Sequence, residues 1–376
     1  MRKSRKKPER ILLLIFTDCF SATYASARNK FVDAAQAAGA TLSQYIHPSA
    51  VGKIGEALTI DVAHLGNRSA DRQLLVISGT HGQEGYAGSA AQVGWLLSSP
   101  DKPVLGDVGV LLVHGLNPYG FSHGSRTNEN NVDLNRNFVD HTQPYPENPG
   151  CDKLHQALTP LVWNRESFDS VSRAEADFLA EEGADALFSA LVAGQYNHPD
   201  GLMYGGNGRE WSNLTLERIL CEHIGHASKV AFIEWHTGIG EYGKPFFLSF
   251  NELHSDERRQ AENWWGEGVS DARPHGMERP TYSGLVFYGV QAFLSKARVA
   301  GAVIEFGTRG PEAGAVAMRQ DRWLRFHGEA VNAEMQTLMR ADLRDSLNPA
   351  SYLWRHAVLD HAVALTDSAV CGLARW

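Results

Sequence analysis

The chain has 376 residues, of which 43% are hydrophobic and 21% charged, a globular composition large enough for one large domain or two. A net charge of −8, with acidic residues spread along the sequence, argues against a nucleic-acid-binding protein. The four cysteines are widely spaced and form no CxxC pair, which indicates free thiols rather than a disulfide framework or a cysteine-bound metal.

The chain begins with a basic stretch, and an apolar run follows at residues 11–16. This order is typical of a signal peptide, but the run is short and no small-x-small cleavage site follows directly. We therefore expect residues 1–10 to be a basic, disordered leader and the protein to be cytoplasmic, with export as the open alternative. No run approaches the roughly 18 apolar residues of a membrane span, so we expect no membrane partner.

Predicted helices and strands alternate along the rest of the chain. Apolar positions at helical spacing predict a helix within 17–47, and the alternation at 58–63 predicts an edge strand. Continuous apolar runs predict further strands at 74–77, 108–113, 229–235, 246–250 and 302–306. Helical patterns occupy 87–97, 151–193, 213–227, 255–268 and 318–345. This order predicts an α/β fold, a three-layer sandwich around a mixed, mostly parallel central sheet, in a single domain over 1–376.

Three of these predicted strands lead into polar residues flanked by glycine. His81 and Glu84 follow the strand at 74–77, His236 ends a second strand, and Glu305 lies at the end of a third. The carboxyl ends of strands are where open α/β sheets bind ligands. Two histidines and a glutamate are the ligand set of a catalytic zinc site with one position left for water. The sequence thus predicts one Zn²⁺ per chain on His81, Glu84 and His236.

Hydrolysis at such a site needs further groups, and the sequence offers candidates for each. A zinc-activated water needs a carboxylate that takes its proton and returns it to the leaving amine. Glu305 fits because it lies on a different strand end from the ligand turn. Arg126, in a long polar loop, can stabilise the developing oxyanion. Arg136 in the same loop can bind a substrate carboxylate through its bidentate fork, assisted by Asn135.

At these residues the sequence resembles the zinc carboxypeptidase (M14) superfamily, which includes the aspartoacylase/succinylglutamate desuccinylase branch. The motifs follow the family's order: His81-x-x-Glu84, Asn117-Pro118-x-Gly120, Asp133-Leu134-Asn135-Arg136-Asn137-Phe138, His236-Thr237-Gly238 and Glu305. Further stretches are similar to the uncharacterised DUF2817 family: Tyr24-x-x-Ala27-Arg28-x-x-Phe31, Asp200-Gly201-x-x-Tyr204-Gly205-Gly206 and Trp211-Ser212-Asn213.

The resemblance implies a zinc carboxypeptidase-like, phosphorylase/hydrolase-like fold and the residue roles given above, including a carbonyl-polarising role for Arg126. It also implies a tyrosine that closes over the substrate. Tyr242, Tyr282 and Tyr288 are candidates, and we favour Tyr288 as the substrate-binding one. The segment 140–210 is longer than the topology needs, which predicts a lid or rim that sets substrate size.

The predicted activity is that of a zinc-dependent hydrolase, a metallo-carboxypeptidase-like M14 metallopeptidase or an amidohydrolase. It would cleave an amide bond next to a free carboxylate, in a small peptide or an N-acyl amino acid. An aspartoacylase-like deacylase is the alternative to a peptidase, and a non-catalytic zinc-binding protein on the same fold is the alternative of another class. A closed pocket beside Arg136 favours acyl amino acids, and an open groove favours peptides. For His114, which ends the strand at 108–113, a structural role is favoured over orienting a metal ligand.

Overall fold

The structure is a computed structural model that describes residues 19–98, 106–269 and 273–376. The predicted leader, residues 1–10, lies outside these residues. Seven strands form one sheet in the order β1-β2-β4-β3-β5-β7-β6. They are β1 (Thr41–Val51), β2 (Ala57–Gly66), β3 (Arg72–Ser78), β4 (Val108–His114), β5 (Lys229–Tyr242), β6 (Pro245–Leu248) and β7 (Arg298–Gly307).

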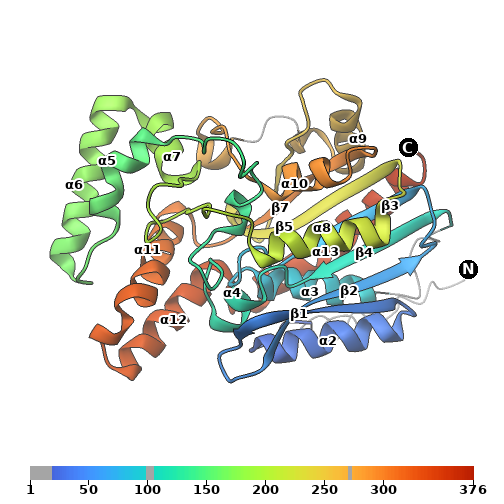
Figure 1. Cartoon of the computed structure of the whole chain (residues 1–376), viewed down its shortest axis with the longest axis horizontal. Coiled ribbons are helices and arrows are strands. Elements are labelled where there is room, and N and C mark those ends of the chain that lie inside the picture. Colours follow the sequence, from blue (N-terminus) through green and yellow to red (C-terminus); the bar gives the residue numbers. More distant parts are fainter. Residues whose placement is uncertain (1–18, 99–105, 270–272) are drawn as a thin grey trace, which may run out of the picture.

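Helices lie on both sides of this sheet and beyond one of its ends (Figure 1). The α-helices are α2 (Tyr24–Ala37), α3 (Gly85–Leu97), α4 (Pro118–His123), α5 (Pro149–Leu158), α6 (Arg165–Glu182), α7 (Ala184–Val192), α8 (Trp211–Ile224), α9 (Asp256–Trp265), α10 (Val286–Phe293), α11 (Pro311–His327), α12 (Ala333–Leu347) and α13 (Tyr352–Leu373). The 3₁₀ turns are η1 (Leu134–Arg136), η2 (Glu267–Val269), η3 (Pro274–Gly276) and η4 (Gly328–Ala330). None of the helices within the described ranges is both long and apolar enough to cross a membrane.

The strand order of the parallel part of the sheet reverses at β3. β3 pairs in parallel with β4 on one side and with β5 on the other, and β5 pairs in parallel with β7. The chain leaves β3 for β4 and later returns to the opposite side of β3 with β5. In open α/β sheets, ligands bind outside the carboxyl ends of the strands at such a reversal.

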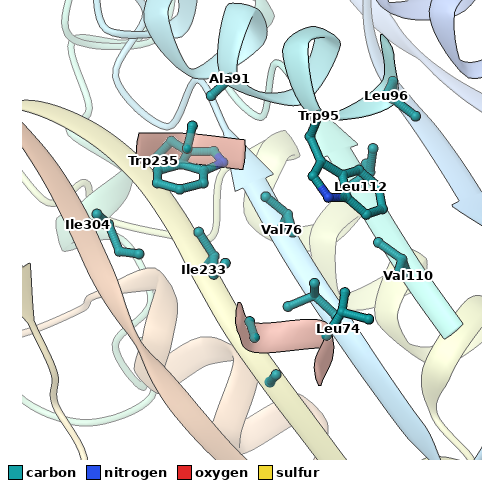
Figure 2. Close-up of a cluster of buried hydrophobic side chains, with 14 of the residues drawn as sticks. Leu74, Val76, Ala91, Trp95, Leu96, Val110, Leu112, Ile233, Trp235 and Ile304 are labelled. Atoms are coloured by element: carbon teal, nitrogen blue, oxygen red, sulfur yellow. The ribbon is translucent and has the colours of Figure 1, made fainter. Parts of the chain in front are cut away.

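Side chains alternate between two cores, one on each face of the sheet. Leu74 and Val76 point into a core completed by α2, α3, α9 and α13. Figure 2 shows part of this core, in which Trp95 and Trp235 pack near Val76. Leu75 and Ile77 point into the other core, completed by α8 and α10. Because both faces are covered, the central strands need apolar residues at every position, which explains their continuous apolar runs. The predicted mixed, three-layer α/β sandwich is thus confirmed.

Two predicted elements differ from the structure. The first helix ends at Ala37, before Gly39 with its φ of +75°, and β1 follows from Thr41. β1 is therefore the edge strand, and the strand predicted at the edge, β2, lies inside the sheet. The helix predicted over 318–345 is two helices, because Asn332 ends the connection after η4 and caps α12 by accepting a hydrogen bond from the Met335 amide.

The segment 140–210 contains α5, α6 and α7, which lie to one side of the sheet, at the left of Figure 1. These helices share a small hydrophobic core of their own, which contains Leu154, Leu158, Val171, Phe178 and Ala190. The segment is thus built around local contacts.

His114 has a structural position in the core. Its Nε2 lies 2.9 Å from the Ser89 hydroxyl oxygen, and its ring stacks on Phe31 with centroids 4.4 Å apart. The side chain is fully buried, and burial lowers the pKa of His114 to about 4. Between pH 6.5 and 4 the unfolded chain therefore binds a proton that the folded protein does not.

We predict that in the His114→Gln variant the free energy of unfolding depends less on pH between pH 6.5 and 4 than in the native protein. The free energy of unfolding of the native protein should fall as the pH drops from 6.5 to 4, with His114 contributing up to about 1.4 kcal/mol per pH unit. Urea unfolding at several pH values measures this slope for both proteins. Parallel curves for the variant and the native protein would contradict the assignment.

Candidate metal centre and its cavity

His81, Glu84 and His236 meet at the carboxyl ends of β3 and β5. One ligand atom from each lies within 4.8 Å of the others, and all three side chains are buried. Nδ1 of His81 lies 2.9 Å from Oε1 of Glu84, and Nδ1 of His236 lies 3.0 Å from Oε2 of the same carboxylate. Both imidazoles therefore turn the same nitrogen toward Glu84. The residues that the sequence predicts as a ligand set are brought together by the fold.

The turn that carries His81 and Glu84 depends on Gly82. A β-carbon added at Gly82 would lie 1.9 Å from the carbonyl carbon of Gly120, at the neighbouring helix α4. Glu84 then occupies the N-cap position of α3. The turn can approach α4 this closely only because residue 82 has no side chain.

A buried carboxylate lies behind each histidine. Nε2 of His81 lies 3.0 Å from Oδ1 of Asp133, and Nε2 of His236 lies 3.1 Å from Oε1 of Glu234. Thr80 donates a hydrogen bond of 2.6 Å to the same Glu234 oxygen. Histidine ligands of metals commonly have a carboxylate near the far nitrogen. In the described residues the His81–Asp133 contact is a hydrogen bond, whereas Nε2 of His236 makes none, so Glu234 acts on His236 through its charge.

Sequence reasoning assigned no role to these two carboxylates. The position of Glu234 near His236 can be predicted from the sequence. It precedes His236 by two residues on β5 and therefore points to the same face of the sheet. The position of Asp133 near His81 cannot be predicted in this way, because Asp133 lies in an irregular loop whose path does not follow from periodicity.

The charges in this cluster shift one another's pKa values. Burial favours the neutral acid of Glu84, but His81 and His236 outweigh it and hold the pKa of Glu84 well below its ordinary value. Burial opposes protonation of His236, but Glu234 and Glu84 outweigh that and raise its pKa well above the ordinary value. The buried centre therefore strongly favours cationic groups around the Glu84 carboxylate.

Glu305 lies on β7 directly beside His236, its register partner on β5. One of its carboxylate oxygens accepts a hydrogen bond of 3.4 Å from the Ile239 amide. Burial, together with the nearby Glu84 carboxylate, raises the pKa of Glu305 to about 7. Glu305 is the only carboxylate besides Glu84 that lines the cavity in the described part of the chain.

Arg126 is fixed by the same carboxylate that supports His81. Its Nε donates to Oδ2 of Asp133 at 3.0 Å, and its Nη1 lies 3.4 Å from Glu84. Burial lowers the pKa of Arg126, but Asp133 and Glu84 outweigh it and raise the pKa above its ordinary value. The guanidinium thus lines the cavity next to the candidate metal ligands as a permanent cation.

Arg136 is buried and forms no ion pair in the described part of the chain, although the nearby Asp133 carboxylate offsets part of its charge. Its two terminal nitrogens donate to the backbone carbonyls of Asn135 and Val192, at 2.5 and 2.6 Å. Its Nε has no hydrogen-bond partner, and no carboxylate forms an ion pair with it, among the residues that the structure describes. Asn135 also lines the cavity, and its side-chain oxygen accepts from the Val286 amide at 2.8 Å. A buried cation of this kind favours an anionic ligand.

One cavity of about 290 Å³ is lined by the three candidate ligands and by Glu305, Arg126, Asn135 and Arg136. Tyr282 lines it, with the Arg136 guanidinium carbon 5.1 Å from its ring centroid. Tyr288 does not line it, because α10 turns that ring toward Phe250 and leaves it 37% exposed. Tyr242 is also absent from the lining and is exposed at the end of β5.

The fold and this cluster define an α/β protein with a candidate His–Glu–His metal centre at the reversal point of its sheet. The chain belongs to the DUF2817 family, described as a protein of unknown function, whose family model matches residues 20–361. No curated protein matches the chain.

Several solved structures resemble the chain at low identity. Bovine thrombin-activatable fibrinolysis inhibitor is 10% identical with a TM-score of 0.47, and the match covers 95% of this chain and 98% of that one. A metallo-carboxypeptidase from Burkholderia cenocepacia is 11% identical with a TM-score of 0.43 and coverages of 92% and 68%. Succinylglutamate desuccinylase from Chromobacterium violaceum is 15% identical with a TM-score of 0.37 and coverages of 85% and 74%. These values are too low to transfer an activity.

We predict that Gly82→Ala displaces the turn that carries His81 and Glu84. The new methyl group overlaps backbone atoms, so the free energy of unfolding should fall by about 1–3 kcal/mol. Gly208→Ala is the matched control, because a β-carbon there meets no atom within 4 Å. Urea unfolding compares the two variants, and equal stability of both would show that the contact with Gly120 is not tight.

Proposed function

We propose that the protein is a zinc-dependent hydrolase that cleaves an amide bond next to a free carboxylate. One observation carries the proposal: two histidines turn Nδ1 toward one glutamate, and each has a buried carboxylate near its other nitrogen. Two imidazoles and a carboxylate suit zinc, and three protein ligands leave a position open. Zinc bound there would polarise a carbonyl group and lower the pKa of a water molecule.

Glu305 is the proposed general base. It shares the cavity with the candidate ligands, and its raised pKa suits a group that must both accept and release a proton near neutral pH. In this role Glu305 takes a proton from the attacking water and returns it to the nitrogen of the leaving amine. Its presence beside a complete ligand set also supports an enzyme over a non-catalytic zinc-binding protein.

The two loop arginines, Arg126 and Arg136, have separate proposed roles in catalysis and in substrate binding. Arg126 is held by Asp133 next to the cluster, where it can donate to the oxyanion that forms as the carbonyl is attacked. Arg136, which lacks a carboxylate partner among the described residues, would bind the substrate carboxylate with Asn135 beside it. Tyr282, whose ring lies near Arg136, replaces Tyr288 as the proposed substrate-contacting tyrosine.

The size of the cavity supports a small substrate. At about 290 Å³ it is at the lower end of the range for ligand pockets. A cavity of roughly 150 Å³ holds one benzene molecule, so this one suits an N-acyl amino acid or a dipeptide. Release of free amine from both substrate classes distinguishes the N-acyl amino acid from the dipeptide.

We predict that Glu305→Gln binds zinc like the native protein but turns over substrate about a hundredfold to ten-thousandfold more slowly, because the base is lost. Amine release under saturating substrate measures kcat, and metal analysis confirms the zinc content. Glu312→Gln, on the exposed first turn of α11, is the control and should keep full activity. Native turnover by Glu305→Gln would exclude this residue as the base.

We predict that His81→Ala and His236→Ala each lose stoichiometric zinc, because a ligand is removed. Glu234→Gln should bind zinc about 10- to 100-fold more weakly, since only the support of His236 is altered. Elemental analysis and competition with a chelator measure both effects. His114→Gln changes a buried histidine outside the cluster and should keep one zinc per chain. Unchanged zinc in the alanine variants would contradict the assigned ligands.

A further inference from the structure

The loop that carries Arg126 lies between α4 and α11, and both helices hold its backbone. On the α4 side, the Asn117 side-chain amide donates to the Arg126 carbonyl at 3.2 Å. The Ser125 backbone amide donates to the Gly120 carbonyl at 2.9 Å. A β-carbon added at Gly120 would lie 2.7 Å from the Ser125 carbonyl oxygen, so the loop packs directly on this helix. The backbone around Arg126 is thus fixed on one side by α4.

Asp321 of α11 holds the other side of the loop. Its Oδ2 accepts a hydrogen bond of 2.6 Å from the Arg126 amide and one of 3.1 Å from the Ser125 hydroxyl group. The Arg126 backbone therefore has its carbonyl group bound from α4 and its amide group bound from α11. One turn further along α11, Arg325 donates to the Glu129 carbonyl, so the same helix also fixes the residues that follow in the loop.

Asp321 makes these contacts as a buried carboxylate, and it is only 5% exposed. It forms no ion pair in the described part of the chain, where the adjacent Arg322 pairs with Asp200 instead, although Arg340 and Arg325 offset part of its charge. Burial raises the pKa of Asp321, which reflects the cost of keeping this charge away from water. An asparagine would accept the same hydrogen bonds without that cost, but hydrogen bonds to a charged acceptor are shorter and stronger. The carboxylate thus holds the loop amide more firmly than a neutral side chain would.

This contact connects Arg126 to a regular element of the fold. The guanidinium is held by Asp133, but Asp133 lies in the same irregular loop as Arg126. Asp321 belongs to a helix of 17 residues, which also lines the cavity with Met318. A group that stabilises an oxyanion must lie within hydrogen-bond distance of it, and a displacement of about 1 Å can cost about a hundredfold in rate. The position of the Arg126 backbone therefore matters for the proposed chemistry.

We propose that Asp321 is a positioning residue that keeps Arg126 where the oxyanion forms, by accepting the hydrogen bond of the Arg126 amide. This inference rests on the proposed function, in which Arg126 stabilises the oxyanion. Asp321 has no contact with the substrate in this role, since it does not line the cavity at the candidate metal centre. The substrate carboxylate is bound by Arg136 instead. Loss of Asp321 should therefore slow the chemical step and leave substrate binding unchanged.

Asp321→Ala tests the proposal on the zinc-loaded full chain, with amine release as the assay. The kcat should fall about 10- to 100-fold because the oxyanion donor is displaced, whereas KM should stay within about threefold of the native value. Asp321→Asn keeps an oxygen acceptor at the Arg126 amide, so its kcat should stay within about fivefold of the native value. Asp321→Ser, whose side chain is one atom too short for this contact, replaces Asp321→Ala if that variant does not fold. Zinc content should remain at one per chain throughout.

Gln320→Ala is the matched control for damage to α11. Gln320 precedes Asp321 and is also buried, but its side chain donates to the Met339 carbonyl of α12 and not to the loop. The variant should lose stability with this hydrogen bond and keep the native kcat. An equal fall of kcat in Gln320→Ala and Asp321→Ala would show that any damage to the helix slows the enzyme, and would overturn the specific role of Asp321.

A double-mutant cycle separates the positioning of Arg126 from a general structural role. In an Arg126→Ala background, Asp321→Ala should change kcat by less than about twofold, because the side chain that Asp321 positions is absent. Losses that multiply in the double variant, or native kinetics in Asp321→Ala, would overturn the inference and leave the proposed function intact. Native kcat in Arg126→Ala would instead exclude the oxyanion role of Arg126, and no amine release by the native protein would exclude the proposed function. Either of these two results would overturn the inference as well.

Discussion

The arrangement of the site depends on the contacts of one buried carboxylate, Asp133. Its Oδ1 lies 3.0 Å from His81 and accepts from the Asn135 amide, while its Oδ2 accepts from Arg126. Burial disfavours its charge, but Arg126 and His81 outweigh that and hold the pKa of Asp133 well below its ordinary value. A single anion thus fixes a candidate metal ligand, a cationic side chain and the start of the Asn135–Arg136 turn relative to one another. Because the carboxylate is fully buried, losing one of these partners would remove part of the compensation of a charge that water does not reach.

The sheet supplies the frame on which this anion acts. β3, β5 and β7 are adjacent and parallel, so their carboxyl ends bring His81, His236 and Glu305 to one place. The irregular loop that carries Asp133 adds Arg126, Asn135 and Arg136 to the cavity, and the segment 140–210 adds part of its lining. The strands therefore supply the candidate metal ligands and Glu305, while the longer connections supply Arg126, Arg136 and part of the cavity lining. This division is common in α/β proteins, where function is placed on loops held by a stable scaffold.

Much of this could be predicted from the sequence, and the reasons for the remainder are physical. Continuous apolar runs identify buried strands, and polar residues at their ends identify the candidate ligands, because both follow from periodicity and sheet topology. β1 was missed because an exposed, largely polar edge strand has no apolar run. The choice of Tyr288 over Tyr282 depended on a helix rotation that spacing does not determine. Asp133 and the cavity lining from the segment 140–210 depend on loop paths and on packing between distant segments, which no local pattern encodes.

We expect one zinc ion to bind His81, Glu84 and His236, with each histidine using Nδ1. Anomalous diffraction from crystals of the zinc-loaded protein, measured on both sides of the zinc absorption edge, tests it most directly. We expect one strong peak per chain, about 2.0–2.1 Å from Nδ1 of each histidine and at bonding distance from Glu84. No peak at this position, or a peak coordinated through Nε2 with Asp133 and Glu234 displaced, would contradict it.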